Sequence, residues 1–406
     1  MARVAVIGGG AAGMMAAIFA AEGGAETLLI ERTPDGGRKI LISGGGRCNI
    51  LPSRLDETRF VTDSSPHTLR NIIRSWPLSE QRAFFEQDLG IPLAEETESA
   101  KLFPVSNKAR DVRDGLLAHA IAKGTTWVPD ATVVGLEQSD TGWRVATEDG
   151  RLIAAEAVIV ATGGLSVPAT GSDGRGLAWL RALGHTVHPT YAALTPVLAN
   201  PNAFGELSGV SLTVTLTASD AERRTEATGG FLFTHRGYSG PSVLDVSHVL
   251  VRSKGAGVDR ARLLVQWTTM NEEAWDAALR PAGPRNVATL VREHMPARLA
   301  DTLLVMAGVA PDTRLSQLRR EDRAKLVGLL ARCDLPWTGH GGYAKAEVTG
   351  GGVSLADIDP RTMESRKRAG LYICGEALDA FGPIGGYNFL WAWATGRAAG
   401  RAAARN

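Results

Sequence analysis

The sequence predicts an α/β protein whose main domain is assembled from both ends of the chain, with strand-rich and helical segments inserted between them. Three observations predict it. Residues 3–32 read as strand, glycine-rich turn, helix and strand. An apolar strand then runs into Thr162-Gly163-Gly164, and a third apolar strand ends at Gly375-Glu376 before the last helix. Alternating strands and helices of this kind form parallel sheets covered by helices.

The first of these segments is a dinucleotide fingerprint. The apolar run of residues 4–7 stops at Gly8, and Gly8, Gly10 and Gly13 form a G-x-G-x-x-G pattern that opens an Ala- and Met-rich helix. Gly8 allows the tight turn, Gly10 lets backbone approach a pyrophosphate, and Gly13 lets helix and strand pack closely. The helix N-terminus offers free N–H groups to the phosphates.

A second apolar run ends on Glu31, 18 positions after Gly13. At the tip of the second strand, its carboxylate can accept both ribose hydroxyls of a dinucleotide and would repel a 2′-phosphate. The bound nucleotide is therefore expected to be of the FAD or NAD kind. A lone G-x-G-x-x-G in a chain with 47 glycines is a weak signal, but the flanking strand, helix and acid make this one specific.

Length and composition limit the alternatives. A chain of 406 residues is expected to form two or three domains, and a formal net charge of +1 lacks the basic excess of a dedicated nucleic-acid binder. Cys48, Cys333 and Cys374 form no C-x-x-C, which suits a reducing cytoplasm. The fingerprint starts at residue 3, leaving no room for a signal peptide, and no apolar run reaches the ~18 residues of a membrane span. We expect a cytoplasmic protein without a membrane partner.

Residues 33–49 are expected to form a ligand loop. Gly44-Gly45-Gly46 can bring backbone against a flat or anionic ligand, while Lys39, Ser43, Arg47 and Asn49 add polar contacts. A flexible surface loop is the alternative. Three consecutive glycines beside a Cys, an Arg and an Asn favour the ligand loop.

The following segments read as helices at 68–76, 79–89 and 112–122, then as short strands with a hairpin turn at Asp149-Gly150. A β-meander closed by a strand ending in Ala161-Thr162-Gly163 is the second signature of FAD enzymes with two dinucleotide-type halves. His185 and His188 are three apart, but no acid or Cys cluster lies beside them in the sequence. We therefore expect a structural or surface role for both, and no metal site.

The predicted domains follow from these patterns. Residues 1–189 and 353–406 form a bipartite Rossmann-like FAD-binding domain, 190–268 an inserted β-barrel, 269–336 a helical subdomain, and 337–352 a return strand of the inserted domain. Residues 271–335 carry ten Lys/Arg against nine Asp/Glu, which indicates a solvated helical surface and no basic patch. Gly385-Gly386-Tyr387-Asn388 opens the last helix, whose N-terminus could stabilise negative charge on a reduced flavin.

Together the motifs GGGAAG, GRKILISGGGRCN, ATGGLSVP, GFLFTHRGYSGP, EVTGGGV and the segment 362–396 resemble the BaiN/YhiN-like (BaiN/RdsA) NAD(P)/FAD-dependent oxidoreductases from end to end. The resemblance implies one bound FAD and reduction of activated C=C bonds, with relatives associated with bile-acid ene reduction and with dihydrouridine formation in ribosomal RNA. The loop Asp379-Ala380-Phe381-Gly382-Pro383 departs from the usual pattern, and Phe381 and Pro383 indicate a divergent subgroup with a reshaped flavin pocket. The residues expected to line FAD are Gly8, Gly10, Ala12, Gly13, Glu31, Arg32, Lys39, Ser43, Gly44, Gly45, Gly46, Arg47, Cys48, Asn49, Val133, Ala161, Thr162, Gly163, Gly375, Glu376, Asp379, Gly385, Gly386, Tyr387 and Asn388.

Ene reduction needs a general acid for the α-carbon, and Cys48 or Tyr387 could supply it. Cys48 is flanked by Arg47 and glycine backbone, and such surroundings expose a thiol and lower its pKa. The alternative is that Cys48 is a small buried spacer. Tyr387 is either a donor or an aromatic packed beside the flavin. His235 and Arg236 lie on a turn of the inserted domain that either caps the site or is a solvated loop.

Three functions remain open. The first is an ene reductase acting on a small molecule. NAD(P)H would be its reductant and would bind only transiently, because the sequence contains only one dinucleotide fingerprint. The second is an RNA-modifying flavoenzyme that reduces a uracil ring, which needs a basic face and a salt-dependent RNA affinity. The third is an FAD-binding electron carrier or a redox sensor that uses Cys48.

Overall fold

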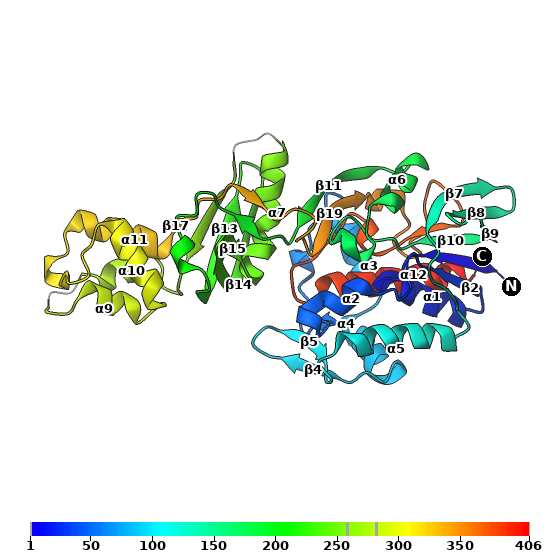
Figure 1. Ribbon diagram of the computed structural model, residues 1–406, viewed down its shortest axis with the longest axis horizontal. Coiled ribbons are helices and arrows are strands. Elements are labelled where there is room, and N and C mark those ends of the chain that lie inside the picture. The colour runs from blue at the N-terminus through cyan, green and yellow to red at the C-terminus, as the bar shows by residue number, and fades with distance from the viewer. Residues whose placement is uncertain (1, 257–259, 281–282, 406) are drawn as a thin grey trace. The chain divides into compact units, whose positions relative to one another are not determined.

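The computed structural model describes residues 2–256, 260–280 and 283–405. The chain divides into two compact units: Met1–Tyr191 with Val348–Asn406, called here the Rossmann-like unit, and Ala192–Glu347, called the inserted unit. Figure 1 shows the blue beginning and the red end of the chain side by side in the first unit. Within the range 337–352, where a return strand of the inserted domain was expected, β18 (Gly339–His340) joins the sheet of the inserted unit, whereas β19 (Val348–Val353) belongs to the Rossmann-like unit.

A five-stranded parallel sheet forms the centre of the Rossmann-like unit, in the order β20-β10-β1-β2-β6. Every residue of β10 and nearly all of β1 and β2 are buried, as expected for a parallel sheet with both faces covered. The strands are β1 (Arg3–Ile7), β2 (Glu26–Ile30), β6 (Thr126–Val128), β10 (Ala157–Val160) and β20 (Leu371–Ile373).

The first and last helices, α1 (Ala11–Glu22) and α12 (Tyr387–Ala403), pack against each other. Gly396 and Gly400 make this possible, because a Cβ atom at either position would overlap the backbone carbonyl of Ala12 or Ala16 on α1. Small residues thus let the C-terminal helix complete a domain begun at residue 1. Helix α5 (Ala109–Ala122) also packs on α1.

Smaller elements of this unit surround the central sheet. The segment 79–89 is not one helix but α4 followed by a π-helical turn, and the loop 33–49 contains the short helix α2 followed by a 3₁₀ turn. The remaining helices are α2 (Arg38–Ile42), α3 (Pro66–Arg74), α4 (Leu78–Ala83) and α6 (Arg175–Ala182). Three small sheets complete the unit. The first joins β3 (Leu51–Pro52), β5 (Lys101–Pro104) and β4 (Leu93–Glu96), and the second joins β7 (Val133–Ser139), β8 (Gly142–Thr147) and β9 (Leu152–Ala155). The third pairs β11 (Val187–Ala193) with β19.

The inserted unit has its own core and a seven-stranded sheet in the order β17-β16-β13-β14-β15-β12-β18. Among the described strands no pairing joins β17 to β18, so closure into a barrel stays a prediction. The strands are β12 (Val197–Leu198), β13 (Ser211–Ser219), β14 (Arg224–Thr234), β15 (Gly237–Ser239), β16 (Arg262–Gln266), β17 (Cys333–Asp334) and β18 (Gly339–His340).

One long helix was not expected in the strand-rich segment 190–265. Helix α7 (Pro241–Ala256) packs on β13 and β14 and buries Val243, Val246, Val249 and Leu250 at helical spacing. Its valines favour strands locally, and burial against the sheet overrides that preference. The helical part holds α8 (Glu272–Ala278), α9 (Val287–Arg292), α10 (Ala297–Ala307) and α11 (Arg320–Ala331). Within the ranges that the structure describes, no helix has the length and apolar character required to cross a bilayer.

Candidate cofactor and catalytic site

The three fingerprint glycines differ in what surrounds them. Gly8 has a φ of 105°, and a Cβ there would lie 2.6 Å from the carbonyl oxygen of Ala161 at the end of β10. A Cβ on Gly13 would overlap the carbonyl oxygen of Gly8. Gly10 instead has no atom within 4 Å of where a Cβ would stand. Two glycines thus serve packing and the middle one faces open space, the arrangement that a pyrophosphate needs to reach the helix N-terminus.

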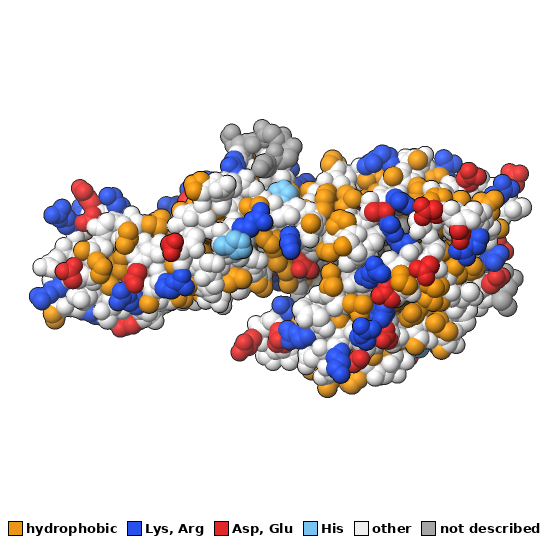
Figure 2. Space-filling model, in the orientation of Figure 1, with side chains coloured by type: hydrophobic (Ala, Val, Ile, Leu, Met, Phe, Trp, Pro, Cys, Tyr) orange, Lys and Arg blue, Asp and Glu red, His pale blue; other side chains and the backbone are white. Residues whose placement is uncertain are grey.

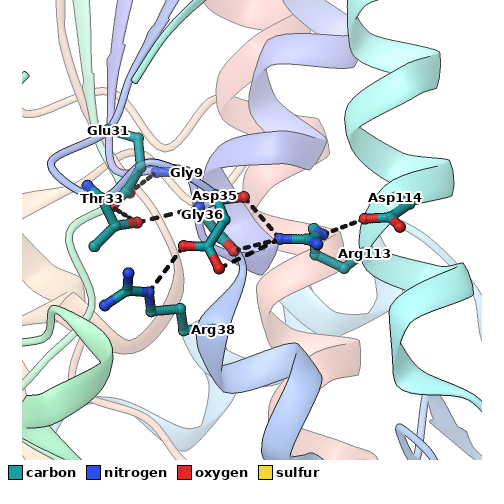
Figure 3. A network of polar contacts seen from close by, with 8 residues as sticks. All are labelled: Gly9, Glu31, Thr33, Asp35, Gly36, Arg38, Arg113 and Asp114. Atoms are coloured by element: carbon teal, nitrogen blue, oxygen red, sulfur yellow. Dashed lines mark hydrogen bonds and ion pairs between the residues drawn. The ribbon is translucent and has the colours of Figure 1, made fainter. Parts of the chain in front are cut away.

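Glu31 follows β2 and is buried beside this turn. Its Oε2 accepts a hydrogen bond from Gly9 N at 2.6 Å, and its Oε1 accepts from Thr33 N at 2.8 Å and Thr33 Oγ1 at 2.7 Å (Figure 3). A carboxylate has about four acceptor positions, so capacity for a ribose hydroxyl remains. The contact with both ribose hydroxyls stays a prediction. The turn itself is held by Glu31.

Arg113 of α5 is a buried cation that no sequence motif indicated. Its Nη1 donates to the carbonyl oxygens of Asp35 at 2.9 Å and Gly36 at 3.2 Å, and its Nε bonds Asp114 (Figure 3). A hydrogen bond and charge from Arg38 lower the pKa of Asp35. Arg113 thus fixes the 35–37 turn between Glu31 and α2.

Arg32 and Val133 are two further residues predicted to bind the cofactor. Arg32 is exposed and its Nη1 lies 2.5 Å from Asp173 Oδ2, so an acid on the chain already pairs with it. Val133 is buried at the start of β7, and Ala131 N nearby donates to Glu31 O at 2.8 Å. Arg32 thus follows Glu31 directly, and Val133 lies two residues beyond a backbone contact with Glu31.

The glycine loop is built around left-handed backbone. Gly44, Gly45 and Gly46 have φ values of 56°, 68° and 85°, and nothing lies within 4 Å of a Cβ on Gly45. Ser43 Oγ donates to Ile40 O at 2.8 Å, and Arg47 pairs with Glu96 at 3.0 Å while its guanidinium covers the Phe103 ring. The backbone of this loop, more than its side chains, is free to meet a ligand.

Asn49 ties the glycine loop to the start of the last helix. Oriented so that both amide groups are paired, its side chain donates to Leu51 O at 3.2 Å and accepts from Gly386 N at 3.0 Å. Gly386 has a φ of 88°, and a Cβ there would collide with the backbone of Leu51. Two motifs more than 300 residues apart in sequence are thus locked together.

The expectation that the Cys48 thiol is exposed and has a lowered pKa is wrong. Its side chain is 0% exposed, and burial raises its pKa to about 12, with only a hydrogen bond involving Ser43 acting in the opposite direction. The flanking Arg47 points to Glu96 and Phe103. Cys48 is the small buried spacer that the sequence also allowed, and it cannot serve as an exposed redox thiol.

All three cysteines are free and buried, which gives a direct test. We expect no thiol of the native protein to react with a disulfide reagent at pH 8, because burial raises the pKa of Cys48, Cys333 and Cys374. After unfolding, three thiols should react. Rapid labelling of one thiol in the native state, mapped to Cys48 by mass spectrometry, would contradict its burial.

A polar cluster joins the glycine loop to the third signature. Lys39 Nζ lies 2.6 Å from Glu376 Oε2 and donates to Ser166 Oγ at 2.6 Å; Ser166 Oγ and Thr349 N donate to Glu376 Oε1 at 2.5 and 3.0 Å. Burial would raise the pKa of Glu376, but the Lys39 charge and these hydrogen bonds outweigh it and lower the pKa. Lys39 and Glu376 were predicted from the sequence to bind the cofactor. Ser166 and Thr349 were not, although they stand in the motifs ATGGLSVP and EVTGGGV.

The turn after β20 reaches the first helix. Gly375 has a φ of 74°, and a Cβ there would lie 2.8 Å from the Cβ of Ala12. Gly375 N donates to Thr395 Oγ1 at 3.0 Å on α12. Ala12 and Gly375, both predicted to line the cofactor, are thus neighbours.

Ala161, Thr162 and Gly163 follow β10, which lies between β1 and β20.

Tyr387 and Asn388 hold the loop before α12 in place. The Tyr387 hydroxyl accepts from Asp56 N at 3.3 Å and donates to Arg54 O at 3.4 Å, and its ring packs on Phe60. The Asn388 amide donates to Gly382 O and accepts from Gly382 N, both at 2.9 Å. Tyr387 is therefore the packing aromatic that the sequence allowed, and its hydroxyl is turned to the backbone.

Asp379 lies at the bottom of a second polar cluster and is only 2% exposed. Its Oδ2 accepts from Ser64 Oγ at 2.7 Å and from Asp63 N and Thr62 Oγ1 at 3.0 Å. His188 Nε2 lies 3.7 Å from the same oxygen. His185, by contrast, is a buried structural residue that contacts Leu180 O and Ser365 Oγ.

His235 and Arg236 are exposed on the turn between β14 and β15, as expected of that motif. They belong to the inserted unit, and their role in capping the site stays a prediction. No group of three metal-ligating side chains occurs among the residues the structure describes.

These features fit FAD: open backbone at Gly10 and Gly45, an acid at the end of β2, and a helix N-terminus behind Gly386. FAD would supply hydride transfer there, held by the fingerprint turn, the glycine loop and the start of α12.

Comparison with known proteins identifies the family to which the chain belongs. A family model described as "HI0933-like protein Rossmann domain" matches residues 2–402. The "Ribosomal RNA dihydrouridine synthase" of Escherichia coli (strain K12) is 32% identical over 96% of this chain and 95% of its own. The "3-dehydro-bile acid delta(4,6)-reductase" of Clostridium scindens is 30% identical over 100% of this chain and 99% of its own. A solved 3-ketosteroid-delta4-(5alpha)-dehydrogenase from Rhodococcus jostii RHA1 shares the fold with a TM-score of 0.51 at 18% identity, over 100% of this chain and 97% of that one. The resemblance drawn from the motifs is confirmed, and the chain belongs to the HI0933-like family and is an FAD-dependent oxidoreductase.

Proposed function

We propose that the protein uses FAD, with NAD(P)H as transient reductant, to reduce an activated C=C bond in a small molecule. The observation that carries the proposal is the open backbone at Gly10, set between the packed glycines Gly8 and Gly13 and next to the buried acid Glu31. The names of the two relatives at 30% identity or more both describe saturation of a C=C bond conjugated to a carbonyl group. The substrate class is inferred from that shared chemistry.

Charge in the inserted unit supports a small-molecule substrate over RNA. Several arginines of its helical part are paired with acids, and Figure 2 shows both signs interspersed over the face that it draws. An RNA-binding face needs unpaired cations facing phosphates. The pairs are Arg292–Asp301, Arg323–Asp276 and Arg332–Glu272. The alternative, reduction of uracil in ribosomal RNA, is favoured by the 32% identical relative, so the test includes it.

The test follows the flavin band anaerobically. We expect a yellow protein that is bleached by NADH or NADPH and reoxidised by a cyclic enone, with little effect of uracil-containing RNA. Reoxidation by RNA alone, with an affinity that falls steeply with salt, would favour the RNA-modifying alternative. Bleaching with no organic acceptor would favour an electron carrier, and a colourless protein that cannot be reconstituted with FAD would overturn the cofactor assignment.

A further inference from the structure

We propose that His188 is the proton donor to the substrate carbon, and that Asp379 and Ser64 are the residues that position it. The proposal rests on the proposed C=C reduction, which requires a proton at the α-carbon. Cys48 is buried and the Tyr387 hydroxyl bonds backbone, so neither sequence-based candidate in the Rossmann-like unit meets that need.

The His188 imidazole lies beside a carboxylate that is itself held by hydrogen bonds. Its Nε2 lies 3.5 Å from Ser64 Oγ and 3.7 Å from Asp379 Oδ2. Ser64 Oγ donates to that carboxylate at 2.7 Å and accepts from Leu355 N at 3.0 Å. A carboxylate held by several donors stays in one place and can orient the imidazole.

Exposure separates His188 from a structural histidine. The His188 side chain is 25% exposed, whereas Asp379 below it is almost fully buried. His185, three residues earlier, is buried with both ring nitrogens in contact with chain oxygens. The His188 side chain thus contacts a buried carboxylate and is itself partly exposed.

His188 is fixed to the loop that carries Glu376. Strand β19 lies between them: a Cβ on Gly351 would overlap Pro189 O, and one on Gly352 would lie 2.7 Å from Ala377 O. Thr349 of the same strand donates to Glu376. The imidazole and the Lys39–Glu376 cluster are thus held by one strand in one unit.

The reduction adds one hydride and one proton to the substrate. Bound FAD, once reduced, would supply a hydride to the substrate β-carbon, and the electron pair of the C=C bond forms a new C–H bond at the α-carbon. The proton comes from the N–H of the His188 imidazolium, whose electron pair stays on nitrogen. The neutral imidazole, which is partly exposed, then takes a proton from water. The net change is addition of H⁻ and H⁺ across the double bond.

The experiment separates the two half-reactions in stopped flow, using His188→Gln, His188→Asn and His67→Gln. His67 is an exposed histidine of α3 in the same unit and serves as the control. We expect both His188 variants to slow reoxidation by a cyclic enone about 100-fold. Reduction by NAD(P)H and reoxidation by ferricyanide, which protonates no carbon, should stay within about twofold, and His67→Gln should change none of the three.

Each contrary outcome has a distinct meaning. Unchanged enone reoxidation in the His188 variants would overturn the proposal while leaving the proposed function intact. Failure of the wild type to be reoxidised by any enone would overturn the proposed function, and this proposal with it. Equal slowing with enone and ferricyanide would show a general disturbance of the site, which also overturns a proton-donor role.

A spectroscopic arm tests the positioning residues without turnover. In protein labelled with ¹⁵N-histidine, the His188 ring signals are identified by their loss in His188→Gln. We expect Asp379→Asn, which keeps the shape of the side chain, to move the His188 signals and leave those of His185 in place. His188 signals that do not move would overturn the role of Asp379.

Discussion

Replacement of Gly13 by Ala is expected to lower the free energy of unfolding of the Rossmann-like unit by about 4 kcal/mol or more, among the largest effects of a single methyl group. The added Cβ would overlap the carbonyl oxygen of Gly8 and also lie 3.3 Å from the Cβ of Ala161. Both obstacles are parts of the central sheet and its turn, so neither can move without parting β1 from α1 or from β10. Thermal or denaturant unfolding, followed by tryptophan fluorescence, measures the effect.

Gly10→Ala is the matched control in the same turn. Its φ of −84° suits any residue, and no atom lies within 4 Å of the new methyl group, so stability should stay within about 0.5 kcal/mol. The methyl would instead occupy the space expected for the pyrophosphate. We expect FAD to be lost on dialysis while the apoprotein stays folded. Equal stability of Gly13→Ala and Gly10→Ala would contradict the different roles assigned to the two glycines.

The elements that could be predicted from the sequence are those encoded locally. Apolar runs at 4–7, 27–30 and 157–160 are long enough only for strands, and the glycine spacing after the first fixes a turn. The chain order of the three signatures also indicated a sheet completed from both ends. The central order β20-β10-β1-β2 agrees with that expectation.

What could not be predicted depends on distant partners. Arg113 and His188 lie in segments without a motif, and their partners Asp35 and Asp379 are remote in sequence. Cys48 has neighbours typical of a reactive thiol, but tertiary packing buries it. Burial reverses the sign of a pKa argument made from sequence neighbours, because desolvation disfavours the thiolate more than a remote cation favours it.

Lys39→Met is expected to destabilise the protein by about 3 kcal/mol at pH 7, because it leaves the Glu376 carboxylate without its cation. The two side chains are only 25% and 17% exposed and form a 2.6 Å pair. The matched control is Lys123→Met, which breaks a 2.7 Å pair with Glu22 in which Lys123 is 39% exposed. Surface pairs contribute little, so this change should cost below about 1 kcal/mol. Unfolding is compared at matched FAD occupancy.

The pH dependence of Lys39→Met identifies its cause. In the wild type the pKa of Glu376 is lowered, so its ionised form contributes stability above its unfolded pKa of about 4.3, and that contribution is lost as pH falls through the folded value. Without Lys39, burial acts with less opposition and raises the pKa of Glu376, so the variant gains stability relative to wild type as the carboxyl is protonated. The penalty of Lys39→Met should therefore shrink between pH 7 and pH 4.5, while that of Lys123→Met stays small. A penalty independent of pH would mean that the loss arises from packing around the Lys39 side chain and not from the charge left on Glu376.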